Sequence, residues 1–218
     1  MELALYNAVL TGVSCSGKEW TYVNQLASSN TDPSRRSDWF TVACCPPNML
    51  RVLGSIGGYI WNLQRKDDID TPIVSVNLYI SSTLECDVAG KSLRVTQTTD
   101  WPWNGKAHFE IESSVPGLEI RLRIPAYATS YEVSPACSGA QRKHGYLTLP
   151  AEWLAEHKTF ALTAPFGSRW IAPRPSTEQR TITLARGPII YCVEDYDNKW
   201  VNDHFRVSIA ALIPRAEC

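Results

Sequence analysis

Two adjacent cysteines stand before two prolines and an asparagine, in the segment Cys44-Cys45-Pro46-Pro47-Asn48. A residue before proline is pushed toward extended conformations, and proline with its preset φ suits the first turn of a helix. The segment therefore predicts two thiols at a helix N-terminus. There the unpaired backbone amides and the positive end of the helix dipole favour a thiolate, the form that attacks electrophiles and binds metal ions.

The local sequence leaves the chemistry of this pair open. The Cα atoms of Cys44 and Cys45 are about 3.8 Å apart as chain neighbours, below the usual range for a disulfide, so a bond between them would be strained. A metal site or free thiols fit better, although two cysteines supply at most two of the four ligands of a zinc site. The structural alternative is that both are small buried hydrophobic side chains, since free cysteine is among the most buried residue types.

The helix that would position the thiols is marked by apolar residues at three- and four-residue spacings, which give it one broad apolar face. These residues are Met49, Leu50, Val52, Leu53, Ile56, Ile60 and Leu63.

The same spacing predicts an earlier helix that runs to Gly12, followed by a short strand over Trp20–Asn24. The earlier helix would begin at Glu2 with no capping residue before it. Two helices cannot by themselves bury the apolar faces that they carry. We therefore expect the chain to lack an N-terminal part of its fold.

Beyond a charged segment at Gln64–Asp68, which we interpret as a linker, apolar and polar residues alternate as in half-buried strands. A second boundary is expected at Ala172–Ser176. The predicted fold is mixed and mainly β, with an antiparallel β-sandwich after the helices. The expected strands are Val74–Ile80, Ala107–Ile111, Leu118–Ile124, Tyr146–Leu149, Phe160–Thr163, Thr181–Leu184, Ile189–Val193 and Phe205–Ile209.

The composition describes an ordinary globular protein, with 218 residues, 44% apolar and 20% charged residues. The net charge of −1 gives no basic patch for nucleic acid or an anionic membrane, so neither partner is expected. The start of the chain lacks the basic region and apolar stretch of a signal peptide, which predicts a cytoplasmic location unless the true N-terminus is missing. Seven scattered cysteines are expected to be reduced thiols.

Several short motifs together resemble glycoside hydrolase family 127, the β-L-arabinofuranosidase family. The double cysteine before Pro-Pro-Asn is the most specific of them, and the Arg-Gly-Pro segment near the C-terminus supports it independently. The motifs are Ala4-Leu5-Tyr6-Asn7, Tyr22-Val23-Asn24, Trp39, Cys44-Cys45-Pro46-Pro47-Asn48, Gly57-Gly58-Tyr59-Ile60, Trp101-Pro102-Trp103-Asn104-Gly105, Arg123-Ile124-Pro125 and Arg186-Gly187-Pro188-Ile189-Ile190-Tyr191.

The resemblance implies a domain order in which an N-terminal (α/α)₆ barrel with the active site is followed by β-sandwich domains. Residues 1–64 would be the last helices of that barrel, residues 65–171 a β-sandwich, and residues 172–218 part of a second β domain. Family members often pair through their β domains, which makes a homodimer of this kind the expected assembly.

The resemblance also implies a mechanism. Cys44 would be the nucleophile of a retaining glycosidase, and a zinc ion would be bound by three cysteines and a glutamate, with Cys44 and Cys45 as two of these ligands. The other cysteine, the glutamate ligand and the acid/base glutamate belong to a family segment that has no counterpart here, and Glu2 matches a different family glutamate. We therefore expect a truncated, inactive fragment of an enzyme that acts on L-arabinofuranoside-type carbohydrates.

Some features depart from the family or have a second interpretation. Where the family continues with Pro-Leu-Glu, this chain has Gln25-Leu26-Ala27, so its sugar specificity is open. Tyr22 is a candidate substrate-binding residue, with a core tyrosine as the alternative. Trp101 and Trp103 are expected to pack on the sheet rather than stack on sugar. The alternative function is a non-catalytic β-sandwich module that binds carbohydrate or braces a partner domain.

Overall fold

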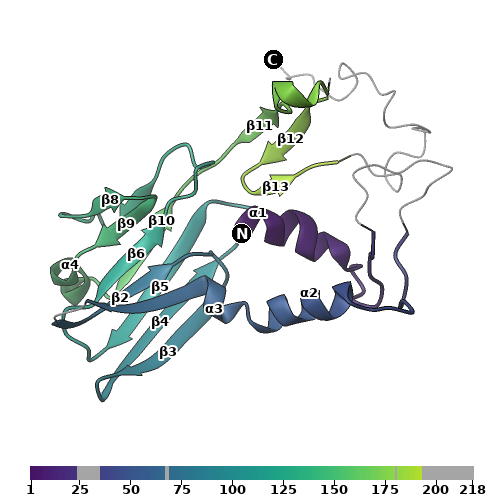
Figure 1. Cartoon of the computed structure of the whole chain (residues 1–218). Coiled ribbons are helices and arrows are strands. Elements are labelled where there is room, and N and C mark those ends of the chain that lie inside the picture. The colour runs from purple at the N-terminus through teal and green to yellow at the C-terminus, as the bar shows by residue number, and fades with distance from the viewer. Residues whose placement is uncertain (24–34, 67–68, 180, 193–218) are drawn as a thin grey trace. The chain divides into compact units, whose positions relative to one another are not determined.

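The computed structural model describes residues 1–23, 35–66, 69–179 and 181–192. The chain divides into two compact units, of which one comprises residues 1–51, 171–184 and 190–218 and the other residues 52–170 and 185–189. The elements of both units are labelled in Figure 1. The expected domain boundaries near residues 64 and 171 stay predictions.

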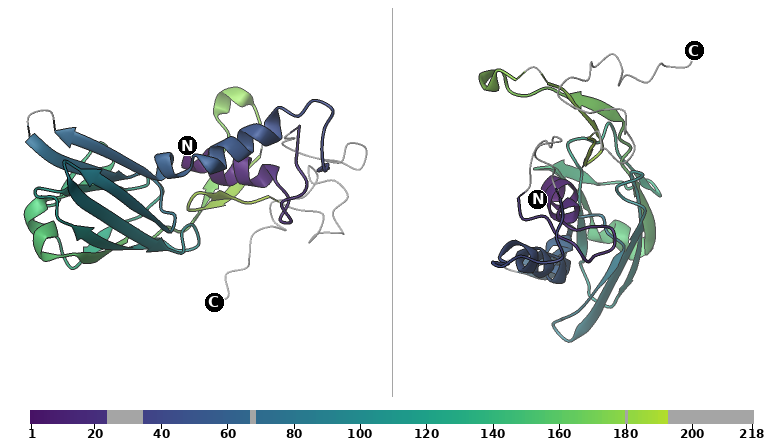
Figure 2. Two further views of the ribbon diagram at one scale, coloured as in Figure 1. Left: turned by 90° about the horizontal axis from the view of Figure 1, so that it is seen from below. Right: turned by 90° about the vertical axis from the view of Figure 1, so that its right-hand side faces the viewer.

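The first unit begins with one continuous helical run. It consists of α1 (Glu2–Ala4), the π-helical turn η1 (Leu5–Val9) and the 3₁₀ turn η2 (Leu10–Gly12), which confirms the helix predicted to Gly12. The run lies beside α2 (Cys45–Gly54), as both views of Figure 2 show. The two meet at Gly12, where an added Cβ would lie 2.6 Å from Cε of Met49.

The apolar face predicted for one helix up to Leu63 is divided between two helices and a strand. After α2 ends at Gly54, a short helix α3 (Gly57–Ile60) follows, and β1 (Trp61–Lys66) begins immediately after it. Glycine weakens helices, and this stretch contains three glycines. The prediction for Leu63 was therefore wrong, and part of the expected linker at Gln64–Asp68 belongs to β1.

The first large sheet has the strand order β1-β2-β6-β9-β8. Its β2 and β6 pair in parallel, with Val76 opposite Leu122, while the other neighbours are antiparallel. This pair departs from the expected antiparallel pattern because the chain visits the second sheet between the two strands, a crossover that parallel pairing requires. The remaining strands are β2 (Ile69–Val76), β6 (Glu119–Arg123), β8 (Gln141–Lys143) and β9 (Tyr146–Leu149).

The second large sheet has the order β3-β4-β5-β10-β7, and all its neighbours are antiparallel. Its strands are β3 (Ser82–Val88), β4 (Lys91–Thr99), β5 (Lys106–Ser113), β7 (Glu132–Ser134) and β10 (Thr159–Thr163). A third sheet and two short helices complete the fold: β11 (Ser168–Ile171), β12 (Thr183–Arg186), β13 (Ile189–Ile190), α4 (Ala151–Glu156) and η3 (Pro175–Thr177).

Each large sheet buries one face, and these faces form the core of a β-sandwich, as predicted. Phe109 and Phe160 stack there with their ring centroids 4.9 Å apart. The buried amide of Gln97 donates from β4 to the carbonyl of Leu78, 3.1 Å away. Both sheets contribute fully enclosed aliphatic side chains, among them Val74, Val76, Ile120, Leu122, Leu149, Val95 and Leu162.

Most predicted strands were found, with shifted ends. The expected strand over Val74–Ile80 ends at Val76, while the one at Tyr146–Leu149 has the predicted bounds. Trp20 forms only isolated bridges, and Phe205–Ile209 lies outside the described residues. Within the described part of the chain, no helix is long and apolar enough to cross a lipid bilayer.

The Trp101-Pro102-Trp103 motif places its two tryptophans differently. Trp101 is buried, its ring centroid lies 4.6 Å from that of Tyr79, and its Nε1 donates to the hydroxyl of Tyr127 at 3.2 Å. Trp103 is 65% exposed. The packing interpretation is therefore confirmed for Trp101 and wrong for Trp103.

Gly105, which ends this motif, has no room for a side chain. The amide of Ala164 donates to the carbonyl of Gly105 at 2.6 Å, and a Cβ on Gly105 would collide with the carbonyl oxygen of Ala164. Because the obstacle is backbone, we expect Gly105→Ala to lower the free energy of unfolding by about 2–3 kcal/mol, measured by denaturant unfolding. In the control Gly167→Ala, a Cβ meets no atom within 4 Å, so an equal loss in both variants would contradict this account.

Candidate active site

The two cysteines lie at the start of α2, as the prolines predict. Cys45 is the first residue of the helix, Cys44 precedes it, and their Sγ atoms are 3.6 Å apart. Asn48 in the first turn donates through Nδ2 to the carbonyl of Cys44 at 3.0 Å, and Arg51 donates to the Oδ1 of Asn48 at 2.6 Å. Cys44 is exposed and Cys45 half-buried, so the alternative of two buried hydrophobic residues was wrong.

Tyr22 lies beside this pair, with its hydroxyl 3.6 Å from the Sγ of Cys44. The segment before it is fixed by backbone hydrogen bonds from Thr21 to Gly12 and between Trp20 and Ser37, all 2.8–2.9 Å long. The ring of Tyr22 lies 5.2 Å from that of Phe40. Because Tyr22 is 41% exposed, the alternative of a core tyrosine was wrong.

The three polar side chains divide their roles by hydrogen bonding. The hydroxyl of Tyr22 donates to the sulfur of Cys44 and lowers the pKa of that thiol, and the thiol of Cys45 acts in the same direction. The same contact with Cys44 raises the pKa of Cys45, because a proton shared toward a thiolate is harder to remove. The pKa of Tyr22 is raised for the same reason. The arrangement favours a thiolate on Cys44 and a thiol on Cys45.

The sulfur atoms also fit one edge of a metal site. Tetrahedral zinc with Zn–S bonds of about 2.3 Å separates two thiolate sulfurs by about 3.8 Å. The observed separation of 3.6 Å is close to that value. Among the residues that the structure describes, no group of three or more His, Cys, Asp or Glu side chains could hold a metal ion. Cys44 and Cys45 thus could supply half of a four-ligand shell.

Comparison with known proteins assigns the chain to a family. Residues 1–58 match the model of the β-L-arabinofuranosidase GH127 catalytic domain, and residues 73–165 match that of the GH127 middle domain. The chain belongs to glycoside hydrolase family 127. The first match contains Tyr22, Cys44 and Cys45, so the thiol site lies in the part that corresponds to the catalytic domain.

Similarity to individual family 127 proteins supports this membership. The non-reducing end β-L-arabinofuranosidase of Bifidobacterium longum subsp. longum is 30% identical over 91% of this chain and 32% of its own length. The crystal structure of a GH127 β-L-arabinofuranosidase from Geobacillus stearothermophilus T6 matches with a TM-score of 0.75 and 29% identity, over 91% of this chain and 33% of that one. The structure of a second GH127 β-arabinofuranosidase matches with a TM-score of 0.76 and 27% identity, over 90% of this chain and 33% of that one. The chain thus spans about a third of the length of these relatives.

Sequence reasoning found the members of the site but missed its contacts. Nothing in the spacing of Tyr22 and Cys44 indicates that they meet, because the contact depends on how the segment before Tyr22 folds back along the first helical run. Phe40 was not predicted at all. The positions Gln25-Leu26-Ala27, where the chain departs from the family, lie outside the described residues.

The hydrogen bond from Tyr22 yields a test by alkylation. Tyr22→Phe removes the donor, so the pKa of Cys44 should rise and its thiolate fraction at neutral pH should fall. We expect Cys44 to react with iodoacetamide severalfold more slowly in this variant, with the midpoint of the rate–pH curve moved to higher pH, as measured by peptide mass spectrometry. Phe40→Leu, which keeps the hydroxyl, serves as the control, and an unchanged curve in Tyr22→Phe would refute the role of Tyr22.

Proposed function

We propose that this chain supplies the nucleophile of a retaining β-L-arabinofuranosidase, and that Cys44 is that nucleophile. The observation that carries the proposal is the exposed sulfur of Cys44 at a helix N-terminus, with the Tyr22 hydroxyl and the Cys45 sulfur each 3.6 Å away. Both neighbours can donate to a thiolate. The match of residues 1–58 to a catalytic-domain model supports the same assignment.

The reaction has two displacements at one carbon. The thiolate of Cys44 attacks the anomeric carbon, the bond to the leaving oxygen breaks, and that oxygen takes a proton from a carboxylic acid. Water then attacks the same carbon and gives a proton to the carboxylate, while the carbon–sulfur bond breaks and the thiolate returns. Two inversions produce retention of configuration. The family resemblance implies the acid/base carboxyl, which would lie on a family segment upstream of residue 1.

Tyr22 and Cys45 have different roles beside the sulfur of Cys44. Tyr22 would keep the attacking atom ionised by donating to it, and its exposed ring is also our candidate for contact with the sugar. Cys45 would remain protonated toward Cys44 when no metal is bound, which leaves one thiolate rather than two. A sugar of the L-arabinofuranoside type and pairing through the β domains are the substrate and assembly that we propose from the family resemblance.

Zinc is the metal that we propose for the pair. When bound, it would keep both thiols deprotonated and fix their positions. Cys44 and Cys45 would be the two ligands from this chain, and the family resemblance implies a further cysteine and a glutamate.

Paired serine variants test the nucleophile. The catalytic assay uses a chimera in which the N-terminal barrel portion of a close family 127 relative is joined to this chain. In that protein Cys44→Ser should reduce the turnover of aryl β-L-arabinofuranosides at least about 10³-fold, because a serine hydroxyl is not ionised. Cys45→Ser should mainly lower zinc content, measured by elemental analysis.

Each outcome discriminates between assignments. If Cys44→Ser stays active while Cys45→Ser is inactive, the roles within the pair are reversed. If both variants retain full turnover, neither thiol is the nucleophile. A chimera that binds substrate with no turnover in any form would favour a non-catalytic carbohydrate-binding module.

Zinc binding by the chain alone is a separate prediction. With only Cys44 and Cys45 as ligands, half of the tetrahedral shell is supplied, so the affinity should be low. Elemental analysis after gel filtration should give clearly less than one zinc per chain, and a mild chelator should remove it. A tight one-to-one complex would overturn this prediction and indicate that another thiol, such as Cys15, completes the site.

A further inference from the structure

The outer face of the first large sheet carries a polar hollow of about 390 Å³ that shares no residue with the cysteine site. Its nine lining residues comprise three amides, three hydroxyl-bearing residues, an arginine, a lysine and a histidine. No aliphatic side chain and no carboxylate is among them. Such a lining suits a ligand rich in oxygen atoms rather than an apolar one.

Strand register assembles this lining from distant parts of the sequence. Asn62 on β1 pairs with Ser75 on β2, Ser75 with Arg121 on β6, and Arg121 with Thr148 on β9, so the four share one face in a row across the sheet. Directly paired residues on neighbouring strands present their side chains on the same side. The opposite face of these strands is the sandwich core.

Two lining residues, Lys143 and His144, come from β8 and the turn after it. Lys143 pairs with Tyr146, and the two residues between them, His144 and Gly145, have φ angles of 50° and 81°. Two positive φ angles are typical of a tight type I′ hairpin turn. The short turn gives Lys143 and His144 defined positions at the rim of the hollow.

Hydrogen bonds fix the positions of two lining residues, Asn77 and Tyr146. The hydroxyl of Tyr146 donates to Oδ1 of Asn77 at 2.7 Å, and the backbone amide of Asn77 donates to the carbonyl of Ile60 at 2.8 Å. The Nε of Arg123 donates to the carbonyl of Asn77. Because the side-chain oxygen of Asn77 accepts from Tyr146, its amino group can donate to a ligand.

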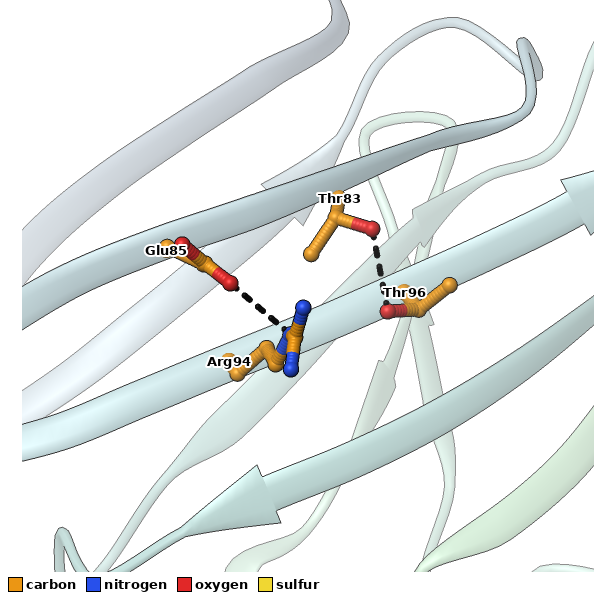
Figure 3. Close-up of polar contacts among 4 residues, drawn as sticks. All are labelled: Thr83, Glu85, Arg94 and Thr96. Atoms are coloured by element: carbon orange, nitrogen blue, oxygen red, sulfur yellow. Dashed lines mark hydrogen bonds and ion pairs between the residues drawn. The ribbon is translucent and has the colours of Figure 1, made fainter.

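Among the described residues, the charged side chains of the hollow have no counterion, in contrast with those on the outer face of the second sheet. On the outer face of the second sheet, Nε of Arg94 lies 2.9 Å from Oε1 of Glu85, as Figure 3 shows beside the Thr83–Thr96 pair. Arg121 and Lys143 have no ion-pair partner among the described residues. Glu119 lies two positions before Arg121 on β6 and is not part of the lining.

We propose that this hollow binds a hexuronate, a sugar acid, with Arg121 and Lys143 contacting its carboxylate and the amides and hydroxyls contacting its ring hydroxyls. The planar fork of arginine matches a carboxylate, and Arg121 and Lys143 supply the positive charge of the lining. The six neutral hydrogen-bonding residues exceed what a bare anion such as phosphate can use. The volume is within the ~300–1,000 Å³ usual for small-ligand sites.

The test is an NMR titration of the full chain with D-galacturonate, D-galactose and inorganic phosphate. We expect saturable shifts with galacturonate at millimolar concentrations, confined to β6 and the β8–β9 turn, and at least tenfold weaker binding of galactose. Arg121→Ala and Lys143→Ala should each weaken galacturonate binding at least tenfold. Lys106→Ala, which removes an exposed cation from the second sheet, should leave it unchanged.

Several results would overturn the proposal. These are no saturable shift with galacturonate up to about 50 mM, equal binding of galactose, or phosphate binding as tightly as galacturonate. Equal weakening by Lys106→Ala would mean that only net charge matters. Thermal unfolding of each variant checks that the sheet is intact, and Arg121→Gln, which keeps a polar side chain without the charge, replaces Arg121→Ala if that variant does not fold.

Discussion

The position of two prolines at the start of α2 constrains the whole thiol site. Pro46 and Pro47 have no amide hydrogen to donate, so they are tolerated only in the first turn of a helix. The chain must therefore enter the helix at this point, and the two preceding side chains are placed at its N-terminal end. The contact between the sulfurs of Cys44 and Cys45 follows from that entry point, and so does the position at which the sulfur of Cys44 can meet Tyr22.

Sequence patterns predicted some strands of the two sheets and missed others, and each outcome has a physical reason. Strands with strict alternation, such as β6 and β9, were found because one face is buried and the other wet. The β3–β4 hairpin was not predicted, since Cys86 and Gln97 stand at positions where a typical strand shows aliphatic residues. Gln97 is buried because its amide bonds to the backbone of Leu78, a partner that no local pattern reveals.

In the candidate active site, too, the sequence predicted the local features but not the tertiary contacts. Local rules were sufficient to place Cys44 and Cys45 at a helix N-terminus, because the prolines act on their immediate neighbours. They were insufficient for the partnership of Tyr22 with Cys44, which depends on the hydrogen bonds between Trp20 and Ser37. The polar hollow on the first sheet was likewise invisible, since it forms from register across β1, β2, β6 and β9.

The parallel pairing of β2 with β6 has a consequence for how the sandwich folds. Val76 and its partner Leu122 are 46 positions apart (122 − 76), and the intervening strands β3, β4 and β5 belong to the other sheet. The β3–β4–β5 meander contains only sequence-local pairings and can form early, whereas the first sheet must wait for a large loop to close. During synthesis, β2 therefore leaves the ribosome with one edge unpaired until β6 emerges. The order of assembly is thus built into the connectivity of the two sheets.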